Sequence, residues 1–373
     1  MNQPQNLPTA DFALCLLANE IAAHPGENVM LSPLSVSLAL GMTANGARGT
    51  TLSGINKALG LGDDIAANNL GYAGLLEALK RTGSGVTLNI ANAIFARLGV
   101  GFKPEFLASS EEFFSAKVDE LDFNDPATVK LINGFVDEAT NHKISRVLGD
   151  TISSEIVMYL INCVYFKGEW SEKFDKALTE NQPFLAPQGS IDLATMYRFG
   201  DMVHVVDRAH SAWEAITLPF GTSEEMRFVV VLPGAGKSVD ELLPVFDAAA
   251  LLRVASTNWK SEGHLWLPRI DVEYDSLLNQ SLQQMGMEQA FADADFSGMR
   301  PIPPVLFISE VKHKTVFAVN EEGAEGAAVT SVGMGLESFS QPFNMRVDRP
   351  FLAFVVDSKT EAVIFAGLIN KPA

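Results

Sequence analysis

The sequence predicts a single large α+β domain, and three observations lead to this fold class. Helical periodicity dominates the chain up to His142, whereas short apolar strands and turns dominate after Gly168. The segment from Ile156 to Tyr165 is almost continuously apolar, which is typical of a strand covered on both faces. No shift in composition marks a linker and no internal repeat is visible, so we assign residues 1–373 to one domain.

The helices are predicted from apolar residues at helical spacing and from their end signals. Residues 11–23 have this spacing, and the His-Pro-Gly run at 24–26 ends it. After a short strand, Ser32 is expected to be the N-cap of the next helix and Pro33 its first residue, because proline lacks the N–H that would be unpaired there. Further helices are expected at 50–59, 64–82, 104–116, 125–142, 238–253 and 275–286.

The strands are predicted where β-branched and aromatic residues lie between turn signals. The first long one is Val86 to Phe95, and 156–165 is the next. Beyond Gly168 the expected strands are 190–197, 203–206, 213–218, 227–232, 264–272, 305–319, 343–346, 351–357 and 361–368.

Composition excludes several classes of partner. A net charge of -18 and a pI of about 4.7 repel nucleic acids and anionic membranes, so we expect neither as a partner. No apolar run is long enough to span a bilayer. Cys15 and Cys163 lie in apolar runs, which indicates small buried side chains, not a disulfide or a metal site. Residues 1–9 lack a basic region followed by an apolar core, so no signal peptide is expected there.

The motifs of enzymes are incomplete. The run from Gly234 to Ser238 is similar to the end of a phosphate loop, but Val231 stands where that pattern needs glycine, and an ATP-dependent enzyme is therefore not favoured. The six histidines lack the spacing of a zinc helix, and no nucleophile elbow is present. Asp293 and Asp295 lack the rest of a calcium-binding pattern. We expect no enzymatic activity, no cofactor and no metal.

A run of small residues from Gly323 to Thr330 separates two strand-like segments, and Glu325 is the only large side chain in it. No proline follows until Pro342, although long loops usually contain proline. A segment that must enter a crowded space as a strand would have this composition, and so would a flexible surface loop. The run alone favours neither interpretation.

Eight blocks of sequence follow one another in an order that carries a family likeness. The blocks are Asn28 to Ser37, Asn45 to Thr51, Ala91 to Phe95, Ile132 to Ile144, Ile161 to Trp170, Leu267 to Arg269, His313 to Gly323, and Asp348 to Gly367. Each is weak alone, but in this order and spacing they cover nearly the whole chain. Together they resemble the serpins, which trap proteases by inserting a cleaved loop into a β-sheet.

The resemblance implies a serpin fold, with three β-sheets, eight or nine helices and an exposed reactive-centre loop at about 321–347. It also implies a suicide-substrate inhibitor of serine endopeptidases. The protease cleaves the loop and forms an acyl-enzyme, and the freed upstream half then inserts as a strand and distorts the enzyme. The alternative is a non-inhibitory serpin that acts as a carrier, chaperone or storage protein.

The hinge that the resemblance implies favours the inhibitor. Side chains alternate between faces in a strand, so Ala324, Gly326, Ala328 and Thr330 would share the buried face, and all are small. Glu325 would stay on the solvent face, which avoids the cost of burying an unpaired carboxylate. The full hinge comprises Glu321, Glu322, Gly323, Ala324, Glu325, Gly326, Ala327, Ala328, Val329 and Thr330.

Two further groups of residues match positions that control opening of the central sheet in serpins. Ser32, Ser35, Asn162 and His313 match the cluster under its middle, called the shutter. Trp170 and Arg269 match its top, called the breach, where Arg269 is expected to pair with Glu321. These roles come from the resemblance and not from composition.

The cleaved bond is predicted from family spacing. Fourteen positions after Gly323 the bond is Glu337-Ser338, while Met334, Leu336 and Phe339 remain alternatives. The target is then a serine protease of the chymotrypsin, elastase, subtilisin or Glu-specific type, with a cysteine protease left open. Only Lys80 and Arg81 are basic in 64–82, so no heparin site is expected, and we expect a monomer. The family favours an extracellular location, and the lack of a visible signal peptide also fits a cytoplasmic one.

Overall fold

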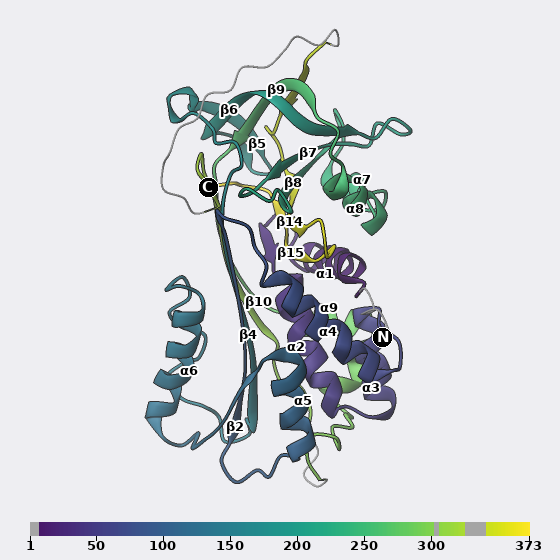
Figure 1. The fold of residues 1–373 in the computed structure, drawn as a ribbon, viewed down its shortest axis with the longest axis vertical. Helices are drawn as coiled ribbons and strands as arrows, with labels where there is room; N and C mark the ends of the chain where they lie inside the picture. The colour runs from purple at the N-terminus through teal and green to yellow at the C-terminus, as the bar shows by residue number, and fades with distance from the viewer. Residues whose placement is uncertain (1–6, 302–305, 325–340) are drawn as a thin grey trace.

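The computed structural model describes residues 7–301, 306–324 and 341–373. The lower half of the molecule in Figure 1 carries most of the helices, and the strands of its upper half form a curved sheet. Long strands connect the two halves.

The helices of the first half agree with the expected segments. They are α1 (Thr9–Ala23), α2 (Pro33–Gly46), α3 (Gly49–Leu59), α4 (Ile65–Leu79), α5 (Pro104–Phe114) and α6 (Pro126–Ala139). The Ser32 side chain accepts a hydrogen bond from the N–H of Ser35 at 3.4 Å, so the predicted cap of α2 is confirmed, with Pro33 at its start.

The two later helices were predicted less well. The segment 238–253 contains α7 (Val239–Leu242) and α8 (Ala248–Ser256), because Pro244 cannot continue a helix and Asp247 caps a new one. The expected helix at 275–286 begins too early. Residues 275–277 belong to a strand. Helix α9 (Asn279–Leu282) is followed by a short π-helix at Gln283–Met287 and a short 3-10 helix at Glu288–Phe291.

The strands of the described residues form three sheets. The first has four strands in the order β12 (Gly323–Ala324), β4 (Met158–Glu169), β2 (Val86–Arg97) and β3 (Lys117–Leu121). The second pairs β10 (Ile270–Leu277) with β11 (Lys312–Val319). The third has nine strands: β1 (Val29–Leu31), β15 (Val363–Ile369), β14 (Phe351–Asp357), β8 (Met226–Pro233), β7 (Trp213–Pro219), β6 (Gly189–Val206), β9 (Ser261–Pro268) and β13 (Phe343–Arg346), with β5 (Glu180–Ala186) paired to β6.

Several strand boundaries differ from the prediction. The segment 264–272 is two strands that meet at Arg269, and 190–206 is one long strand. Of 305–319 only Lys312–Val319 is a strand; residue 305 lies outside the described part. Strands β3 and β5 were not predicted. Strand β5 contains Pro183, which is tolerated because β5 pairs on one side only.

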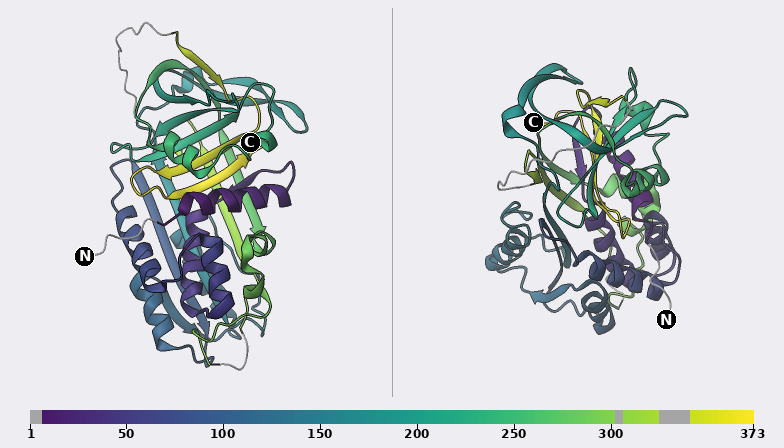
Figure 2. Two further views of the ribbon diagram at one scale, coloured as in Figure 1. Left: turned by 90° about the vertical axis from the view of Figure 1, so that its right-hand side faces the viewer. Right: turned by 45° about the horizontal axis from the view of Figure 1, so that its top comes forward.

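The core is densest around the C-terminal hairpin. Strands β8, β14 and β15 are buried along their whole length, and α1 packs against β15. Figure 2 shows α1, in purple, beneath the yellow hairpin. Phe365 of β15 contacts Phe166 of β4 and Phe317 of β11, the two long strands between which the candidate site lies.

Candidate functional site

Strands β4 and β11 run along the two sides of a gap in the molecule. Strand β4 pairs with β2, and β11 pairs with β10, but the described residues give no hydrogen-bonded ladder between β4 and β11. A cavity of about 540 Å³ lies between them, lined by residues 158–166 of one strand and 312–318 of the other. The edges of both strands are therefore available to a further strand.

The prediction that both faces of 156–165 are covered is only partly correct. Ile161 and Cys163 are buried with α6, but Leu160, Asn162 and Val164 are half-buried and line the cavity. An apolar run predicts buried faces, but it does not show that, among the described residues, the strand beside β4 is absent and a cavity lies there instead.

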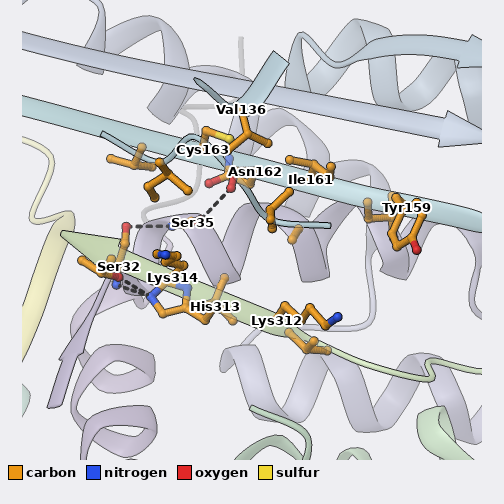
Figure 3. A pocket seen from close by; sticks show the side chains of 18 of the residues that line it. Ser32, Ser35, Val136, Tyr159, Ile161, Asn162, Cys163, Lys312, His313 and Lys314 are labelled. Carbon is orange, nitrogen blue, oxygen red and sulfur yellow. Dashed lines mark hydrogen bonds between the residues drawn. The ribbon is translucent and has the colours of Figure 1, made fainter. Parts of the chain in front are cut away.

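The predicted shutter residues lie together at the middle of the gap (Figure 3). The backbone N–H of Ser32 donates to His313 Nε2 at 3.0 Å, and Thr315 Oγ1 lies 2.8 Å from the same nitrogen. Since an amide can only donate, Nε2 accepts and the ring proton is on Nδ1. Burial lowers the pKa of His313 to about 4, although the nearby Glu20 carboxylate acts in the opposite direction. His313 is therefore neutral at pH 7.

The other half of the shutter belongs to β4. Ser35 Oγ donates to the carbonyl oxygen of Asn162 at 3.4 Å. The side-chain amide of Asn162 donates to Asn92 Oδ1 at 2.5 Å, and Asn92 in turn donates to the carbonyl of Phe114 at 2.7 Å. Ser32 contacts β11 and Ser35 contacts β4, so the first turn of α2 connects the two strands.

One acceptor of this network is incomplete. Asn162 Oδ1 is buried and has no donor among the described residues. A buried acceptor without a partner destabilises a protein by about 1–3 kcal/mol. Asn162 lines the cavity, so a group that entered the gap could supply the missing hydrogen bond.

The upper end of the gap is closed by the start of the hinge. Gly323 pairs with Glu169 and Ala324 with Gly168, antiparallel to β4. Gly323 has φ 138°, and a Cβ on it would lie 2.0 Å from the carbonyl oxygen of Gly168. Only glycine fits this position. Ala324 is 3% exposed, on the buried face where the alternation predicts it.

Glu321 is held by the partner that the sequence predicted. Arg269 Nη2 donates to Glu321 Oε1 at 2.7 Å and Arg269 Nε at 2.9 Å, while Thr179 Oγ1 donates to the same oxygen at 2.6 Å. Burial alone would raise the pKa of the Glu321 carboxyl, but the hydrogen bonds from Arg269 and Thr179 outweigh it, and the pKa lies below its ordinary value. Thr179 was not predicted.

Glu322 has a second set of charged partners, which the sequence analysis missed. Lys176 Nζ lies 2.8 Å from Glu322 Oε1, and Lys173 Nζ lies 3.0 Å from Oε2. The hydrogen bond from Lys176 lowers the pKa of the Glu322 carboxyl most. Burial acts in the opposite direction, but the hydrogen bond from Lys173 adds to that from Lys176, and the pKa lies below its ordinary value. Lys173 lies in an irregular segment after β4 and Lys176 begins a short 3-10 helix at Lys176–Leu178, and no sequence spacing connects either lysine to residue 322.

Trp170 fixes the backbone of the same turn. Its indole N–H donates to the carbonyl oxygen of Asn320 at 2.8 Å, and its backbone N–H donates to the carbonyl oxygen of Glu322 at 2.9 Å. The ring is 3% exposed and stacks on Phe220 with 4.4 Å between centroids. Trp170, Arg269, Lys173 and Lys176 thus hold residues 320–322 through both backbone and side chains.

The remaining predicted site residues lie outside the described part of the chain. These are Glu325, Gly326, Ala327, Ala328, Val329 and Thr330 of the hinge, and Glu337 and Ser338 of the cleaved bond, with the alternatives Met334, Leu336 and Phe339.

The other side chains that the sequence singled out give one correction. Cys15 was expected to be buried, but it is exposed on the outer side of α1, whereas Cys163 is buried and burial raises its pKa to about 12. Among residues 7–301, 306–324 and 341–373 no cluster of three or more His, Cys, Asp or Glu could hold a metal ion. In the same ranges no helix combines the length and apolarity needed to cross a membrane.

Comparison with known proteins identifies the family. A family model described as Serpin (serine protease inhibitor) matches residues 8–372. The chain belongs to the serpin family. Serpin B8 of Homo sapiens is 33% identical, with 97% of each chain covered. Serpin A3-3 of Bos taurus is 32% identical over 97% of this chain and 88% of that protein.

Solved serpin structures share the fold. Tengpin, a thermophilic serpin in the native state, matches with a TM-score of 0.87 and 30% identity, covering 100% of this chain and 95% of its own. A thyroxine-binding globulin complex with thyroxine matches with a TM-score of 0.85 and 25% identity, covering 98% of each chain. The predicted α+β serpin fold is confirmed, with three sheets and nine α-helices in the described residues.

Proposed function

We propose that this serpin is a suicide-substrate inhibitor of serine endopeptidases, whose cleaved loop inserts between β4 and β11. One observation carries the proposal. Strand β12 is already paired antiparallel with β4 at the top of a gap in which both strand edges are unpaired. A loop cut downstream can extend β12 into this gap without breaking an existing ladder.

The length of the loop fits the length of the gap. Residues 324–337 would span roughly 45 Å as a strand at about 3.3 Å per residue, and the 12 residues of β4 span about 40 Å. Cleavage at Glu337-Ser338 therefore frees a segment as long as the edge that receives it. In the register of β12, Met334 would stand opposite Met158 at the end of β4, so a cut at Glu337-Ser338 frees enough chain to pair with the whole edge.

The register of β12 also suggests what completes the shutter. If the strand continues from the pair Ala324 and Gly168, Thr330 stands opposite Asn162. Opposite residues of an antiparallel pair point to the same face, so the Thr330 hydroxyl would lie beside Asn162 Oδ1, the acceptor that has no donor. Insertion would then add a hydrogen bond worth about 1 kcal/mol besides the new ladder.

A small protease panel tests the function. The protein is incubated with chymotrypsin, pancreatic elastase, subtilisin and a Glu-specific endopeptidase, and the products are separated in SDS. We expect a covalent complex with at least one enzyme, a cut mapped by mass to Glu337-Ser338, and a rise in the unfolding temperature of the cleaved protein. Cleavage by every enzyme with no complex would instead support the carrier, chaperone or storage alternative.

Two neighbouring alanines supply a matched control for insertion. Ala328→Glu would place a carboxylate on the buried face of the inserted strand, at a cost of several kcal/mol. Ala327→Glu makes the same chemical change on the opposite face, beside Tyr165 on the side of α6 and not in the main core. We expect the first variant to be cleaved without trapping and the second to trap normally. Equal trapping by both would contradict strand insertion.

A further inference from the structure

The solvent-facing side of the upper sheet carries a row of aromatic rings. Strands β6 and β9 pair so that Tyr197 lies opposite Trp266 and Phe199 opposite His264. The ring centroids of these two pairs are 5.2 and 4.6 Å apart. Opposite residues share a face, so the four rings form one continuous layer.

Strand β13 adds a charge to this layer. Arg346 lies opposite Trp266 in the β13–β9 ladder, and its guanidinium carbon is 3.7 Å from the Trp266 ring centroid. Arg346 Nη1 also donates to Gln182 Oε1 at 3.1 Å, which fixes the guanidinium over the ring. We call the five residues Tyr197, Phe199, His264, Trp266 and Arg346 the aromatic face.

The aromatic face is not part of the core. The neighbouring residues Met196, Leu265 and Met345 point to the opposite side and are 0% exposed. On the aromatic face Phe199 is 49% exposed, and the other three rings are only half-buried. The solvent side of an antiparallel sheet normally carries polar residues, so a group of exposed rings needs an explanation.

The composition of the face is that of a protein interface. Aromatic residues and arginine are enriched at the centres of interfaces, and they contribute most of the binding energy there. Arg346 supplies a fixed positive charge among these five residues, and Asp201 lies opposite Glu262 at the end of the same face. The face therefore presents exposed rings with a cation over Trp266, and it suits a partner surface with apolar groups and hydrogen-bond acceptors.

The position of the face indicates which partner would meet it. Strand β13 starts two residues after Gln341, where the described chain resumes, and it lies with β6 and β9 at the upper end of Figure 1. Six residue steps separate Glu337 from Phe343, and they reach at most roughly 21 Å. A protease domain of about 220 residues has a radius of gyration of about 17 Å, so an enzyme at that bond is wide enough to touch the face.

We propose that the aromatic face is a docking surface for the body of the target protease. This inference rests on the proposed function, because it takes the cleaved bond to lie in the loop before β13. Contacts on the face add to those of the loop during the encounter and so raise the rate of association. They act before cleavage, and so do not change the partition between trapping and release.

The test compares a double variant with a control at the other end of the molecule. In Phe199→Ala/Arg346→Ala the face loses its most exposed ring and its charge. In the control, Leu98→Ala, a side chain that is 61% exposed is shortened beyond the end of β2. The probe is the enzyme that the wild type traps fastest among chymotrypsin, pancreatic elastase, subtilisin and the Glu-specific endopeptidase.

We expect the second-order rate constant of inhibition to fall at least about tenfold in the double variant and to stay unchanged in the control. Tenfold corresponds to about 1.4 kcal/mol. The stoichiometry of inhibition and the unfolding temperature should stay at wild-type values. A change in either would indicate that the face supports β13 structurally and would overturn the proposal.

The remaining outcomes also decide the question. An unchanged rate with the probe enzyme overturns the docking surface while leaving the inhibitory function intact. A wild type that traps no protease removes the proposed function and this inference with it. A wild-type dimer in sedimentation that becomes a monomer in the double variant would assign the face to self-association and overturn the proposal.

Discussion

The gap between β4 and β11 is closed at its upper end by charged and aromatic side chains, whereas the polar groups at its middle are uncharged. At the top, Arg269 and Lys176 hold two consecutive glutamates, and Trp170 covers them. In the middle, a neutral histidine and an asparagine with a free acceptor face the cavity. Ion pairs resist separation, while neutral hydrogen bonds exchange partners at small net cost. Under the proposed function, the top would therefore hold the loop and the middle would admit it.

The largest effect is expected from Gly323→Ala, which breaks the upper end. The new Cβ would meet the carbonyl oxygen of Gly168, and φ 138° is strained for any side chain. Strain and overpacking together should lower the free energy of unfolding by about 4 kcal/mol. Thermal unfolding measures this. Gly149→Ala is the control, because a Cβ there meets no atom within 4 Å, and an equal loss in both variants would contradict the argument.

As pH falls, the middle of the gap should lose its contribution to stability before the upper end does. The pKa of His313 is about 4 in the folded protein and 6.5 ordinarily, so the His313 ring binds a proton more tightly when the chain is unfolded. The stability contributed by neutral His313 is complete above pH 6.5 and is lost as pH falls towards 4, by about 3 kcal/mol in total.

The stability contributed by Glu321 and Glu322 is lost in a lower pH range. Their folded pKa values lie below the ordinary 4.5, so their contribution is complete above that value and is lost only at more acid pH. Denaturant unfolding between pH 7 and 4 should therefore show a slope that His313→Gln flattens. A slope that persists in this variant would contradict the assignment to His313.

Arg269→Ala tests the upper clamp with a smaller effect. Removing one partner of a buried ion pair costs about 3–5 kcal/mol, and because Arg269 is half exposed we expect about 2 kcal/mol. Release of Glu321 should also speed spontaneous loss of inhibitory activity on warming several-fold. Arg146→Ala is the control, since Arg146 pairs with Asp150 at 2.7 Å on the surface. Equal rates for the variant and wild type would argue against a clamp.

The smallest effect is confined to the cleaved protein. Thr330→Val removes the hydroxyl predicted to reach Asn162 after insertion, so the cleaved form should lose about 1 kcal/mol of stability. Thr330→Ser keeps the hydroxyl and should behave like the wild type. Calorimetry of cleaved and intact forms separates the two states, and a loss in the intact form instead would place the contact before cleavage.

The sequence predicted local structure well where the signal is local. The Ser32 cap, the start of α2 at Pro33 and the C-terminal end of α1 follow from residues a few positions apart. The pair of Arg269 and Glu321 was predicted only because a family likeness connected two distant positions. Cys15 shows the limit of a pattern, because an apolar neighbourhood along the chain did not prevent it from facing solvent.

By itself, then, the sequence determined the α+β class, the order of the serpin blocks and the small side chains on one face of the hinge. Only the tertiary structure decided that β4 and β11 stand apart, that Glu322 reaches Lys173 and Lys176, and that Asn162 keeps an unpaired oxygen. The aromatic face likewise exists only through the register of β6, β9 and β13. Helix caps and alternation depend on neighbouring residues, whereas these features depend on how distant strands are aligned.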